Sequence, residues 1–547
     1  MLRESLKYVL TVTLLMSFAL GTLAFECAGK QAKKCLPTKK KDGICLINQK
    51  MLADGNTIYT IRYDFILEED IVLKAGCTLR FKGGSICNKA GNRFTITGNN
   101  TKISGKQKHI FDKVRFRGTW DIDRVTSDML KDLSSVNSLI ELCNLCSNNR
   151  NNTIELGPGK YYIDVKQTEP IQSGLLIKSN TEVLLNGDIF LVNSDYNYYG
   201  IIDLLNVHNV FIHGIGSITG DLDLSKATGG GGHAIRVRQS SDIIIDGLTI
   251  RKCIGDGIYV DTYDNISISN CHIDNCRRQG ISITNVANCR IEKCDICNIS
   301  GDALASWAID IEPNANNNCD SVIIKNCRIH NTDKGICCTY STGVTASVKN
   351  VYIDNNNVSC MHKALFVDGG LGPIYVRNNL ITGYDRVEYP NKIVELPYWC
   401  IENKGIAFFY NNIIEGGILN SYEAEYTENT ITSHFVSLQK VKCHKNKFNM
   451  TAGKPDNDLI QLSGEFSDNV IKVLKSPHRA GMIFDVRGQS VIHDNIIYDA
   501  EIDVTSYGKV YGIARESVKG FSEIYNNSHS DSFSGSLERN YKRLRPL

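Results

Sequence analysis

Asp256-Gly-Ile-Tyr-Val260 is one copy of a five-residue pattern that recurs through the middle of this 547-residue chain. Each copy has Gly or Ala at its second position, Ile or Leu at its third and, in all copies but one, Val or Ile at its fifth. The central Ile or Leu falls at positions 235, 258, 281, 309, 336 and 365, so the spacing is 23 to 29 residues. A period of this length predicts a solenoid, in which each coil buries its apolar side only by stacking on its neighbours. The other five copies are His233-Ala-Ile-Arg-Val237, Gln279-Gly-Ile-Ser-Ile283, Trp307-Ala-Ile-Asp-Ile311, Lys334-Gly-Ile-Cys-Cys338 and Lys363-Ala-Leu-Phe-Val367.

Two further apolar runs follow each copy in the same order. The second run alternates inward apolar and outward residues, as in Asn265-Ile-Ser-Ile268, and a third Ile or Val comes five residues after its end, as at Ile273. Alternation with a period of two in short runs is typical of half-buried strands. Three short strands per turn, with Gly and Asn at the corners, predict an all-β chain folded as a right-handed parallel β-helix.

Residues 1–24 have the pattern of an export signal. Arg3 and Lys7 precede an apolar stretch from Tyr8 to Leu20, and Thr22-Leu-Ala24 provides a small-residue cleavage site. We therefore expect an exported protein, in the periplasm, on the surface or outside a bacterial cell. No other stretch of the sequence is long and apolar enough to cross a bilayer, so no membrane span is expected once the signal is removed.

The remaining sequence divides into four parts. Residues 25–125 are expected to form a leader and the first β turns. A helix over 126–148, with an apolar stripe of leucines, is expected to cap the open end of the solenoid. The β-helix itself is expected over 149–530, and a basic tail over 531–547.

The overall charge gives no case for a nucleic-acid partner. The chain has 61 Lys and Arg against 59 Asp and Glu, a formal net charge of +2. A nucleic-acid-binding chain usually carries a clear excess of basic residues. The sequence contains no indication of the oligomeric state.

Twenty cysteines in an exported chain raise the question of disulfides. Cys271, Cys294 and Cys327 all lie two residues before the third-strand Ile, and Asn356 and Asn379 hold the same position in later turns. A position shared by Cys and Asn predicts an inward-facing corner ladder of small side chains rather than a set of bridges. A few bridges remain open for the other cysteines, among them Cys27, Cys35 and Cys45.

The outer wall of the first strand is where chemistry is expected. If the central Ile points inward, the residues one and three positions later point outward, and adjacent turns lie about 4.8 Å apart. Immediately before each strand, further polar or aromatic residues accompany this wall. The candidate site residues are His233, Arg236, Tyr259, Asp261, Arg277, Arg278, Gln279 and Trp307 for substrate binding, and Asp256, Asp310 and Glu312 as catalytic acids.

Two chemistries fit these residues. Glycoside hydrolysis needs one carboxylic acid and one carboxylate, and Asp256 and Asp310 are two turns apart. That reaction requires no cofactor. Alternatively, β-elimination of a uronic acid needs a cation and a base. Asp310 and Glu312 would bind Ca²⁺ through their oxygens, and Arg277 or Arg278 would either bind the substrate carboxylate or act as the base. Calcium is thus expected only for the lyase.

At these residues the sequence resembles the pectate-lyase-like β-helix superfamily, in particular the polygalacturonases, over roughly residues 150–480. Leu156-Gly-Pro-Gly-Lys-Tyr161 resembles an opening motif of that superfamily, and Asp256-Gly-Ile258 matches one of the polygalacturonase acid positions. His233 and Arg278-Gln-Gly280 stand where that family has other catalytic residues. The resemblance therefore implies the fold and an exported carbohydrate-active protein, but only Asp256 of the catalytic set. Asp310, Glu312 and Arg278 resemble the acid-x-acid calcium site and arginine of lyases such as chondroitinase B.

The sequence thus predicts an exported polysaccharide-active enzyme, a glycoside hydrolase or a polysaccharide lyase, acting on an acidic or decorated glycan. The alternative is a non-catalytic glycan-binding or surface-attachment module, for which the same wall would suffice.

Overall fold

The structure is a computed structural model that describes residues 31–529, except 37–39, 42–43, 90, 149, 166–172, 193–197, 223–230, 302–305, 341–344, 370, 384–385, 390–391, 396–398, 452–458, 475–481, 501–510, 514–522 and 526–527. The expected signal peptide and basic tail lie outside the described residues. The chain forms two compact units, Met1–Ser147 and Asn148–Leu547. No helix among the described residues is both long enough and apolar enough to cross a membrane.

The first unit contains two small sheets of short strands. Its core includes a chain of edge-to-face aromatic contacts, with ring centroids 5.4 Å apart for Phe81–Phe111, 4.7 Å for Phe111–Phe116 and 5.5 Å for Phe116–Trp120. The pairing is parallel except between β2 and β3. One sheet holds β1 (Ala32–Cys35), β4 (Thr57–Ile61), β6 (Ile71–Val72), β7 (Thr78–Phe81), β9 (Thr95–Gly105) and β11 (Arg115–Asp121). The other holds β2 (Lys40–Lys41), β3 (Ile44–Ile47), β5 (Asp64–Leu67), β8 (Ser85–Cys87) and β10 (Phe111–Asp112).

The expected capping helix over 126–148 is wrong in extent. Among the described residues of that range, the structure has a 3-10 turn at Ser127–Met129 and a short helix, α2 (Ser138–Cys143). The strand β12 (Arg124–Thr126) comes just before them, and another 3-10 turn lies earlier in the chain, at Gln49–Leu52. The Asp132 side chain accepts hydrogen bonds from the backbone and hydroxyl of Ser134, a local turn that competes with helix formation. Asn137 has φ of 63°, a left-handed conformation that an α-helix cannot contain. The leucine stripe is nevertheless buried, because Leu139, Leu142 and Leu145 are at most 2% exposed.

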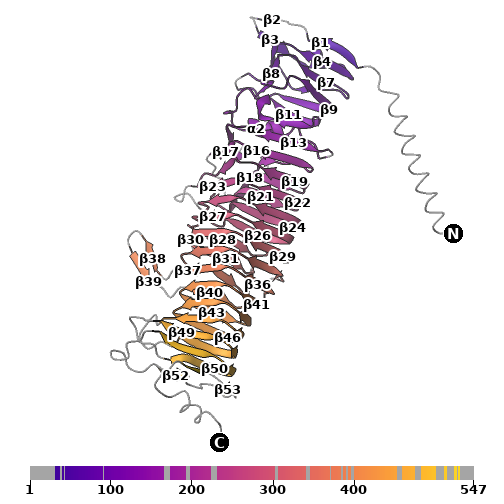
Figure 1. The fold of residues 1–547 in the computed structure, drawn as a ribbon. Coiled ribbons are helices and arrows are strands. Elements are labelled where there is room, and N and C mark those ends of the chain that lie inside the picture. Colours follow the sequence, from indigo (N-terminus) through magenta and orange to yellow (C-terminus); the bar gives the residue numbers. More distant parts are fainter. Residues whose placement is uncertain are drawn as a thin grey trace, which may run out of the picture. The chain divides into compact units, whose positions relative to one another are not determined.

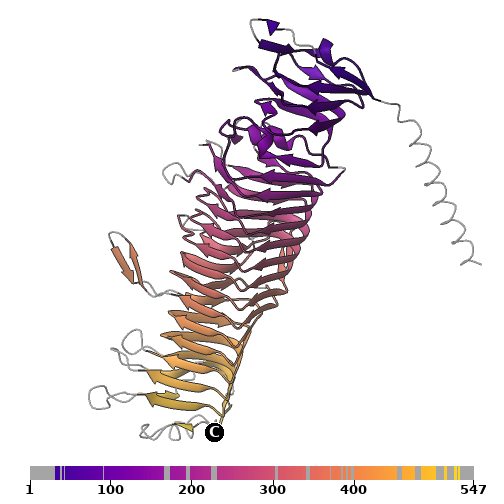
Figure 2. The same cartoon turned by 45° about the horizontal axis from the view of Figure 1, so that its top comes forward.

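The second unit is a parallel β-helix whose coils each contribute one strand to each of three columns. Figures 1 and 2 show its strands stacked in sequence order from β13 to β53. The first column contains β15 (Ser173–Leu176), β18 (Tyr198–Leu205), β21 (Gly231–Arg238), β28 (Trp307–Ile311), β31 (Lys334–Cys338), β35 (Leu365–Val367), β40 (Trp399–Asn403), β43 (Ile418–Tyr422) and β52 (Tyr511–Ile513).

The second column contains β13 (Asn152–Leu156), β16 (Thr181–Leu185), β19 (His208–His213), β22 (Ser241–Asp246), β29 (Asn318–Lys325), β32 (Ser347–Lys349), β33 (Val351–Asp354), β36 (Ile374–Arg377), β41 (Ala407–Tyr410), β44 (Ala424–Thr427) and β53 (Glu523–Tyr525). Five long strands run through both columns: β24 (Ile258–Ser269), β26 (Ile281–Glu292), β46 (Phe435–His444), β48 (Ile460–Ser467) and β50 (Met482–His493).

The third column is a separate sheet. It contains β14 (Lys160–Ile163), β17 (Asp188–Leu191), β20 (Ser217–Thr219), β23 (Thr249–Arg251), β25 (His272–Asp274), β27 (Asp295–Cys297), β30 (Arg328–Thr332), β34 (Asn357–Cys360), β37 (Leu380–Gly383), β42 (Ile413–Gly416), β45 (Thr430–Ser433), β47 (Lys447–Met450), β49 (Val470–Leu474), β51 (Ile496–Ala500) and β54 (Ser528–His529). An antiparallel hairpin, β38 (Arg386–Tyr389) and β39 (Lys392–Glu395), is inserted between β37 and β40.

The register confirms the repeat read from the sequence. Residues 235, 258, 281, 309, 336 and 365 pair in succession in the first column, and residues 250, 273, 296, 329, 358 and 381 pair in the third. The next partner of Leu365 is Ile401, 36 residues later, which exceeds the spacing of 23 to 29 residues seen in the repeat. The sequence pattern fails there because the hairpin insertion interrupts the period.

The corner between the second and third columns carries the expected ladder of small side chains. Cys271, Cys294 and Cys327 are at most 2% exposed, and from Asn356 onward asparagines replace cysteine at this position. Each buried asparagine amide donates to the side-chain oxygen of the asparagine one turn later, from Asn356 through Asn379, Asn412, Asn429, Asn446 and Asn469 to Asn495. The residue before each ladder position has positive φ, which explains the Asn and Asp enrichment of the corners.

None of the 19 described cysteines is in a disulfide, so the bridges considered for Cys35 and Cys45 are absent. Cys27 lies outside the described residues. Buried thiols stack along the corners as small apolar groups, and they fill space where a disulfide would need a specific separation.

Replacing Asn412 with Ala should lower the free energy of unfolding by about 3 kcal/mol, because it removes the side-chain acceptor of the buried Asn379 backbone N–H and the side-chain donor to the Val376 carbonyl. The matched control is Ile413→Ala, the next residue, whose outward side chain is 46% exposed. Chemical denaturation of both variants measures the difference. Equal stability of the two variants would contradict a stabilising role for the ladder.

Candidate functional site

The predicted outward residues of the first column do form one continuous row. Arg236 pairs with Tyr259, Tyr259 with Ser282, Ser282 with Asp310, Asp310 with Cys337, Cys337 with Phe366, and Phe366 with Glu402. Their inward neighbours, such as Ile258, Ile281 and Ile309, are completely buried. Residues far apart in the sequence are therefore neighbours on this face, which we call the first-column wall.

The wall is less exposed than its outward position predicts. Arg236, Asp310 and Cys337 are each 1% exposed and Ser282 is 5% exposed, whereas Tyr259 and Phe366 are partly exposed. The large side chains of the wall contribute to this cover: Tyr198 lies over the Arg236 guanidinium at 5.0 Å. Strand alternation predicted that these side chains would be exposed, and that prediction was wrong. Alternation indicates which face a side chain is on, but not whether other side chains on that face cover it.

The row three positions after the central Ile is broken by a bulge. Asp261 pairs with Asn285 rather than with Thr284, so the alignment expected for those two residues is wrong. Thr284 is 6% exposed, and its hydroxyl donates to the hydroxyl of Tyr259 at 3.2 Å. Asp261 accepts a hydrogen bond from the Asn317 amide at 3.4 Å.

Asp256, Gln279 and Asp310 form the centre of the wall. The backbone N–H of Gln279 donates to Asp256 Oδ1 at 3.3 Å, and the side-chain amide of Gln279 donates to Asp310 Oδ2 at 2.9 Å. Gln279 therefore bridges two carboxyl groups that come from coils two turns apart. All three residues are at most 2% exposed.

Burial changes the acidity of both carboxyl groups. It raises the pKa of Asp256 to about 7 against the opposing effect of Arg278, with a further increase from the Asp310 charge. Burial and the neighbouring Glu312 charge raise the pKa of Asp310 to about 7, although hydrogen bonds from Gln279 and Cys337 stabilise its ionised form. At neutral pH the two groups are therefore poised between the acid and the carboxylate.

His233 adjoins Asp256 on the preceding turn. Its Nδ1 accepts a hydrogen bond from the Asp256 backbone N–H at 3.2 Å and lies 3.3 Å from Asp256 Oδ2. The imidazole stacks on the Tyr259 ring, with centroids 4.8 Å apart. Burial and three nearby arginines lower the pKa of His233 well below its ordinary value, so the ring is neutral.

Arg278 and Glu312 are partly exposed residues that interact with the buried carboxyl groups of this centre. Arg278 lies 4.0 Å from Asp256 Oδ1, and its side chain is 29% exposed. Burial raises the pKa of Glu312, and the Arg278 charge opposes that rise. Arg277 is turned aside, since its Nε donates to the Ile254 carbonyl at 2.8 Å. Of the two arginines predicted to bind substrate, Arg278 has the better position.

A separate cationic cluster lies toward the N-terminal end of the wall. Arg236 and Arg238 both contact Asp203 Oδ2, at 2.5 and 2.9 Å, and Ser173 donates to the same oxygen at 2.5 Å. Arg236 and Asp203 are at most 1% exposed, while the Arg238 side chain is 22% exposed. Asp261 on the next coil pairs in register with Arg238, so this end of the wall carries two guanidinium groups and two carboxyl groups.

Toward the C-terminal end, Trp307 belongs to an aromatic and lysine-rich cluster. Its ring stacks on that of Phe366 with centroids 6.1 Å apart, and Lys334 lies 5.3 Å from the Trp307 ring. Lys363 and Lys404 lie 4.9 and 5.4 Å from the Phe366 ring, and both pair with Glu402. Trp307 is only 7% exposed, so Phe366 presents the accessible ring.

The residues predicted to hold calcium make a poor calcium site. Ca²⁺ takes 6–8 oxygen ligands. Asp310 is buried and bonded to the Gln279 amide, which leaves Glu312 as the accessible carboxylate of the predicted pair. Within the described ranges, no group of three or more His, Cys, Asp or Glu is arranged to hold a metal ion.

The sequence analysis missed Asp203, Tyr198, Lys363, Glu402 and Lys404. Asp203 follows Ile202, which pairs with Ile235, so extending the repeat one turn toward the N-terminus finds it. Lys363 begins the last quoted copy of the repeat, at the same position as Trp307. Glu402 and Lys404 lie beyond the hairpin insertion, which interrupts the period that would align them.

Comparisons with known proteins agree with this architecture. A family described as "Right handed beta helix region" matches residues 205–381. The SPbeta prophage-derived uncharacterized protein YorA of Bacillus subtilis (strain 168) is 26% identical over 270 residues, which are 43% of this chain and 45% of YorA. The chain thus spans less than half the length of that curated relative.

Two solved structures are similar at low identity. The tailspike protein of E. coli bacteriophage HK620, in complex with a pentasaccharide, matches with a TM-score of 0.45 and 11% identity, over 74% of this chain and 78% of that chain. The A-module of the mannuronan C-5 epimerase AlgE6 of Azotobacter vinelandii matches with a TM-score of 0.45 and 12% identity, over 73% of this chain and 96% of that chain. From its strand columns and from the matched family, the chain is a right-handed parallel β-helix protein.

Proposed function

We propose that the first-column wall binds an acidic glycan and hydrolyses a glycosidic bond, with Asp256 and Asp310 as the reacting carboxyl groups. The export-signal pattern of residues 1–24 supports an activity outside the cytoplasm. A coil-by-coil wall suits a linear polymer, because each turn adds one row of side chains along it.

The observation that carries the proposal is the shifted acidity of the two bridged carboxyl groups. Perturbed pKa values produced by burial and a nearby charge are concentrated at functional sites. Both groups have a pKa of about 7, and the charge on Asp310 contributes to the shift of Asp256. Because they interact, the pair titrates as a unit and holds about one proton at neutral pH.

The environments assign a role to each carboxyl. The charge of Glu312 favours the protonated form of Asp310, so we assign Asp310 as the general acid. The charge of Arg278 is the largest influence that favours the carboxylate of Asp256, so we assign Asp256 as the general base. The acid transfers its proton to the glycosidic oxygen as the C–O bond breaks. The base takes a proton from the water that attacks the anomeric carbon, which restores one proton to the pair.

The spacing favours inversion of configuration. Two turns of stacking separate the strands by about 9.6 Å, and inverting enzymes place their carboxyl groups roughly 6.5–9.5 Å apart. Side-chain reach covers the small difference. A retaining mechanism would need a separation of about 5 Å, which is closer to the spacing of adjacent turns.

Unsatisfied polar atoms on the wall support a polar ligand. Asp310 Oδ1, Gln279 Oε1 and Arg236 NH1 are buried and have no hydrogen-bond partner among the described residues. Each such atom costs about 1–3 kcal/mol unless a water or a ligand group reaches it. The hydroxyl groups of a sugar can both donate hydrogen bonds to such atoms and accept hydrogen bonds from them.

Charge and aromatic rings favour an acidic substrate. Arg238 and Arg278 are partly exposed on the coils before and after that of Tyr259, and Lys363 and Lys404 lie 4.9 and 5.4 Å from the Phe366 ring farther along the wall. Sugar rings stack on aromatic faces, and uronic-acid carboxylates pair with these cations. β-Elimination, the alternative reaction, uses the same groups but needs a cation that neutralises the substrate carboxylate. Arg278 supplies that positive charge without calcium.

One observation favours a non-catalytic binding function instead. Asp256 and Asp310 are at most 1% exposed, whereas Tyr259, Arg278 and Phe366 are accessible. A module that only binds glycan needs the accessible residues alone, and its buried acids would serve to position them.

Asp256→Asn and Asp310→Asn should each lower turnover of a cleaved polysaccharide by about 10² or more, since each removes a proton-transfer group. The measurement is the release of reducing ends from a panel of acidic polysaccharides. Unsaturated products, followed by ultraviolet absorbance, report elimination instead. The control is Asp320→Asn, which alters a carboxyl on the second column.

The outcomes separate the candidates. Reducing ends without new absorbance, lost in both Asp variants, support hydrolysis. New absorbance establishes a lyase. Retention of a glycan by the wild type, with neither product and with loss in Arg278→Ala, establishes the binding module and rejects the enzyme.

Asp310→Asn should also stabilise the fold at pH 8. The pKa of Asp310 rises from its ordinary value of 3.8 to about 7 in the folded chain. Ionisation of this buried carboxyl therefore lowers the free energy of unfolding progressively as the pH rises from about 4 to about 7. Removal of that cost should raise the free energy of unfolding by up to about 4 kcal/mol at pH 8, with little gain at pH 4.

Asp320→Asn is the control with the opposite sign. Burial favours its neutral form, but hydrogen bonds from Asn350, Lys349 and Ser321 dominate and lower the pKa of Asp320. This variant should lose stability at pH 8. Thermal unfolding of both variants at the two pH values tests the pair, and a loss of stability in Asp310→Asn at pH 8 would contradict the raised pKa.

A further inference from the structure

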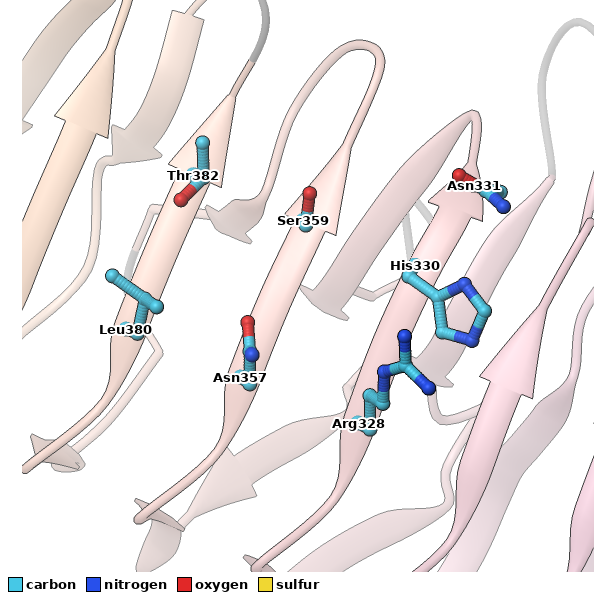
Figure 3. Close-up of a pocket in the computed structure, with 7 residues that line it drawn as sticks. All are labelled: Arg328, His330, Asn331, Asn357, Ser359, Leu380 and Thr382. Atoms are coloured by element: carbon cyan, nitrogen blue, oxygen red, sulfur yellow. The ribbon is translucent and has the colours of Figure 1, made fainter.

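The third column carries a cavity that takes no part in the proposed reaction. Its volume is about 450 Å³, and it opens over three successive coils at β30, β34 and β37. Figure 3 shows its side chains projecting from one face of these strands, with the Arg328 guanidinium and the His330 ring next to each other. Its lining includes Arg328, His330, Asn357, Ser359, Leu380 and Thr382.

The register arranges these residues in two rows. Arg328 pairs with Asn357 and then Leu380, while His330 pairs with Ser359 and then Thr382. One row therefore runs from a guanidinium through an amide to an apolar side chain, and the other from an imidazole through two hydroxyls. Coils are about 4.8 Å apart, so the rows extend across the length of a sugar residue.

The His330 ring is held in place from outside the cavity. Its Nε2 contacts Asp295 Oδ1 at 3.1 Å, and the other oxygen of Asp295 contacts His272 Nδ1 at 3.0 Å. Both oxygens of that carboxylate are thus engaged by imidazoles. A hydrogen bond to one ring nitrogen orients the ring and leaves Nδ1 of His330 for another partner.

Arg328 supplies the charge of the cavity. Its side chain is exposed, and the structure gives it no ion pair or hydrogen bond among the described residues. The cavity lining contains no carboxylate. A planar guanidinium with unused donors matches a carboxylate or a sulfate group geometrically.

We propose that this cavity binds an acidic saccharide unit, with its anionic group at Arg328 and His330. The sugar hydroxyls bond to Asn357, Ser359 and Thr382, and Leu380 contacts the apolar face of the ring. This combination of a few convergent polar groups and an apolar contact is typical of small-ligand sites, whose volumes are about 300–1,000 Å³. The site is on a different column from the wall, so it holds whether or not the wall is catalytic.

The test is calorimetric titration of the full chain with a uronic-acid trisaccharide, a sulfated trisaccharide and a neutral trisaccharide. The background is Asp256→Asn with Arg278→Ala, which suppresses cleavage and binding at the wall. On that background the acidic trisaccharide should bind at least tenfold more weakly after Arg328→Ala. Ser359→Trp should abolish binding, because its outward side chain fills the cavity.

The matched control is Arg290→Ala, an exposed arginine of the second column that pairs with Glu292 at 2.6 Å and should leave the affinity unchanged. Preference for the uronic or the sulfated probe identifies the anionic group. The inference is overturned if no acidic trisaccharide binds, if the neutral one binds equally well, or if Arg328→Ala and Ser359→Trp bind like the background chain. None of these outcomes depends on whether Asp256 and Asp310 catalyse hydrolysis.

Discussion

In-register stacking of the coils is the constraint on which the rest of this structure depends. Inward isoleucines lie directly over one another in the first and third columns, and the buried Cys and Asn ladder fixes the corner between the second and third. A shift of one residue would turn every apolar side chain of a strand outward. The register therefore decides both the core and the composition of each outer face.

The same constraint creates the unusual electrostatics of the wall. Two carboxyl groups from coils two turns apart are held by one glutamine and shielded by larger neighbours, so neither is solvated as an exposed aspartate is. Their acidity follows from position rather than from residue type. Lys363 and Lys404 at the C-terminal end of the wall share the single carboxylate of Glu402, and this excess of positive charge is part of the basis for the proposed acidic glycan.

Much of the fold could be read from the sequence because a β-helix repeats its pattern. The five-residue copies located the first column, and the Cys and Asn positions located the corner ladder. The capping helix could not be judged by its leucine stripe alone, since Asp132 and Asn137 favour turns over helix. The repeat places Asp256, Gln279 and Asp310 on neighbouring coils, where Gln279 bridges the two carboxyl groups, but it does not predict their burial. Mutual shielding of side chains depends on three coils at once, and strand alternation carries no information about it.

The most direct test of this account is carbon-13 NMR titration of the aspartate side-chain carboxyls, assigned with Asp256→Asn and Asp310→Asn. Stacked, shielded and bridged groups should titrate near pH 7, and the midpoint of Asp256 should fall when Asp310 is replaced, because the Asp310 charge contributes to the shift. Midpoints near 4 for both groups, with no response of one to loss of the other, would contradict the account.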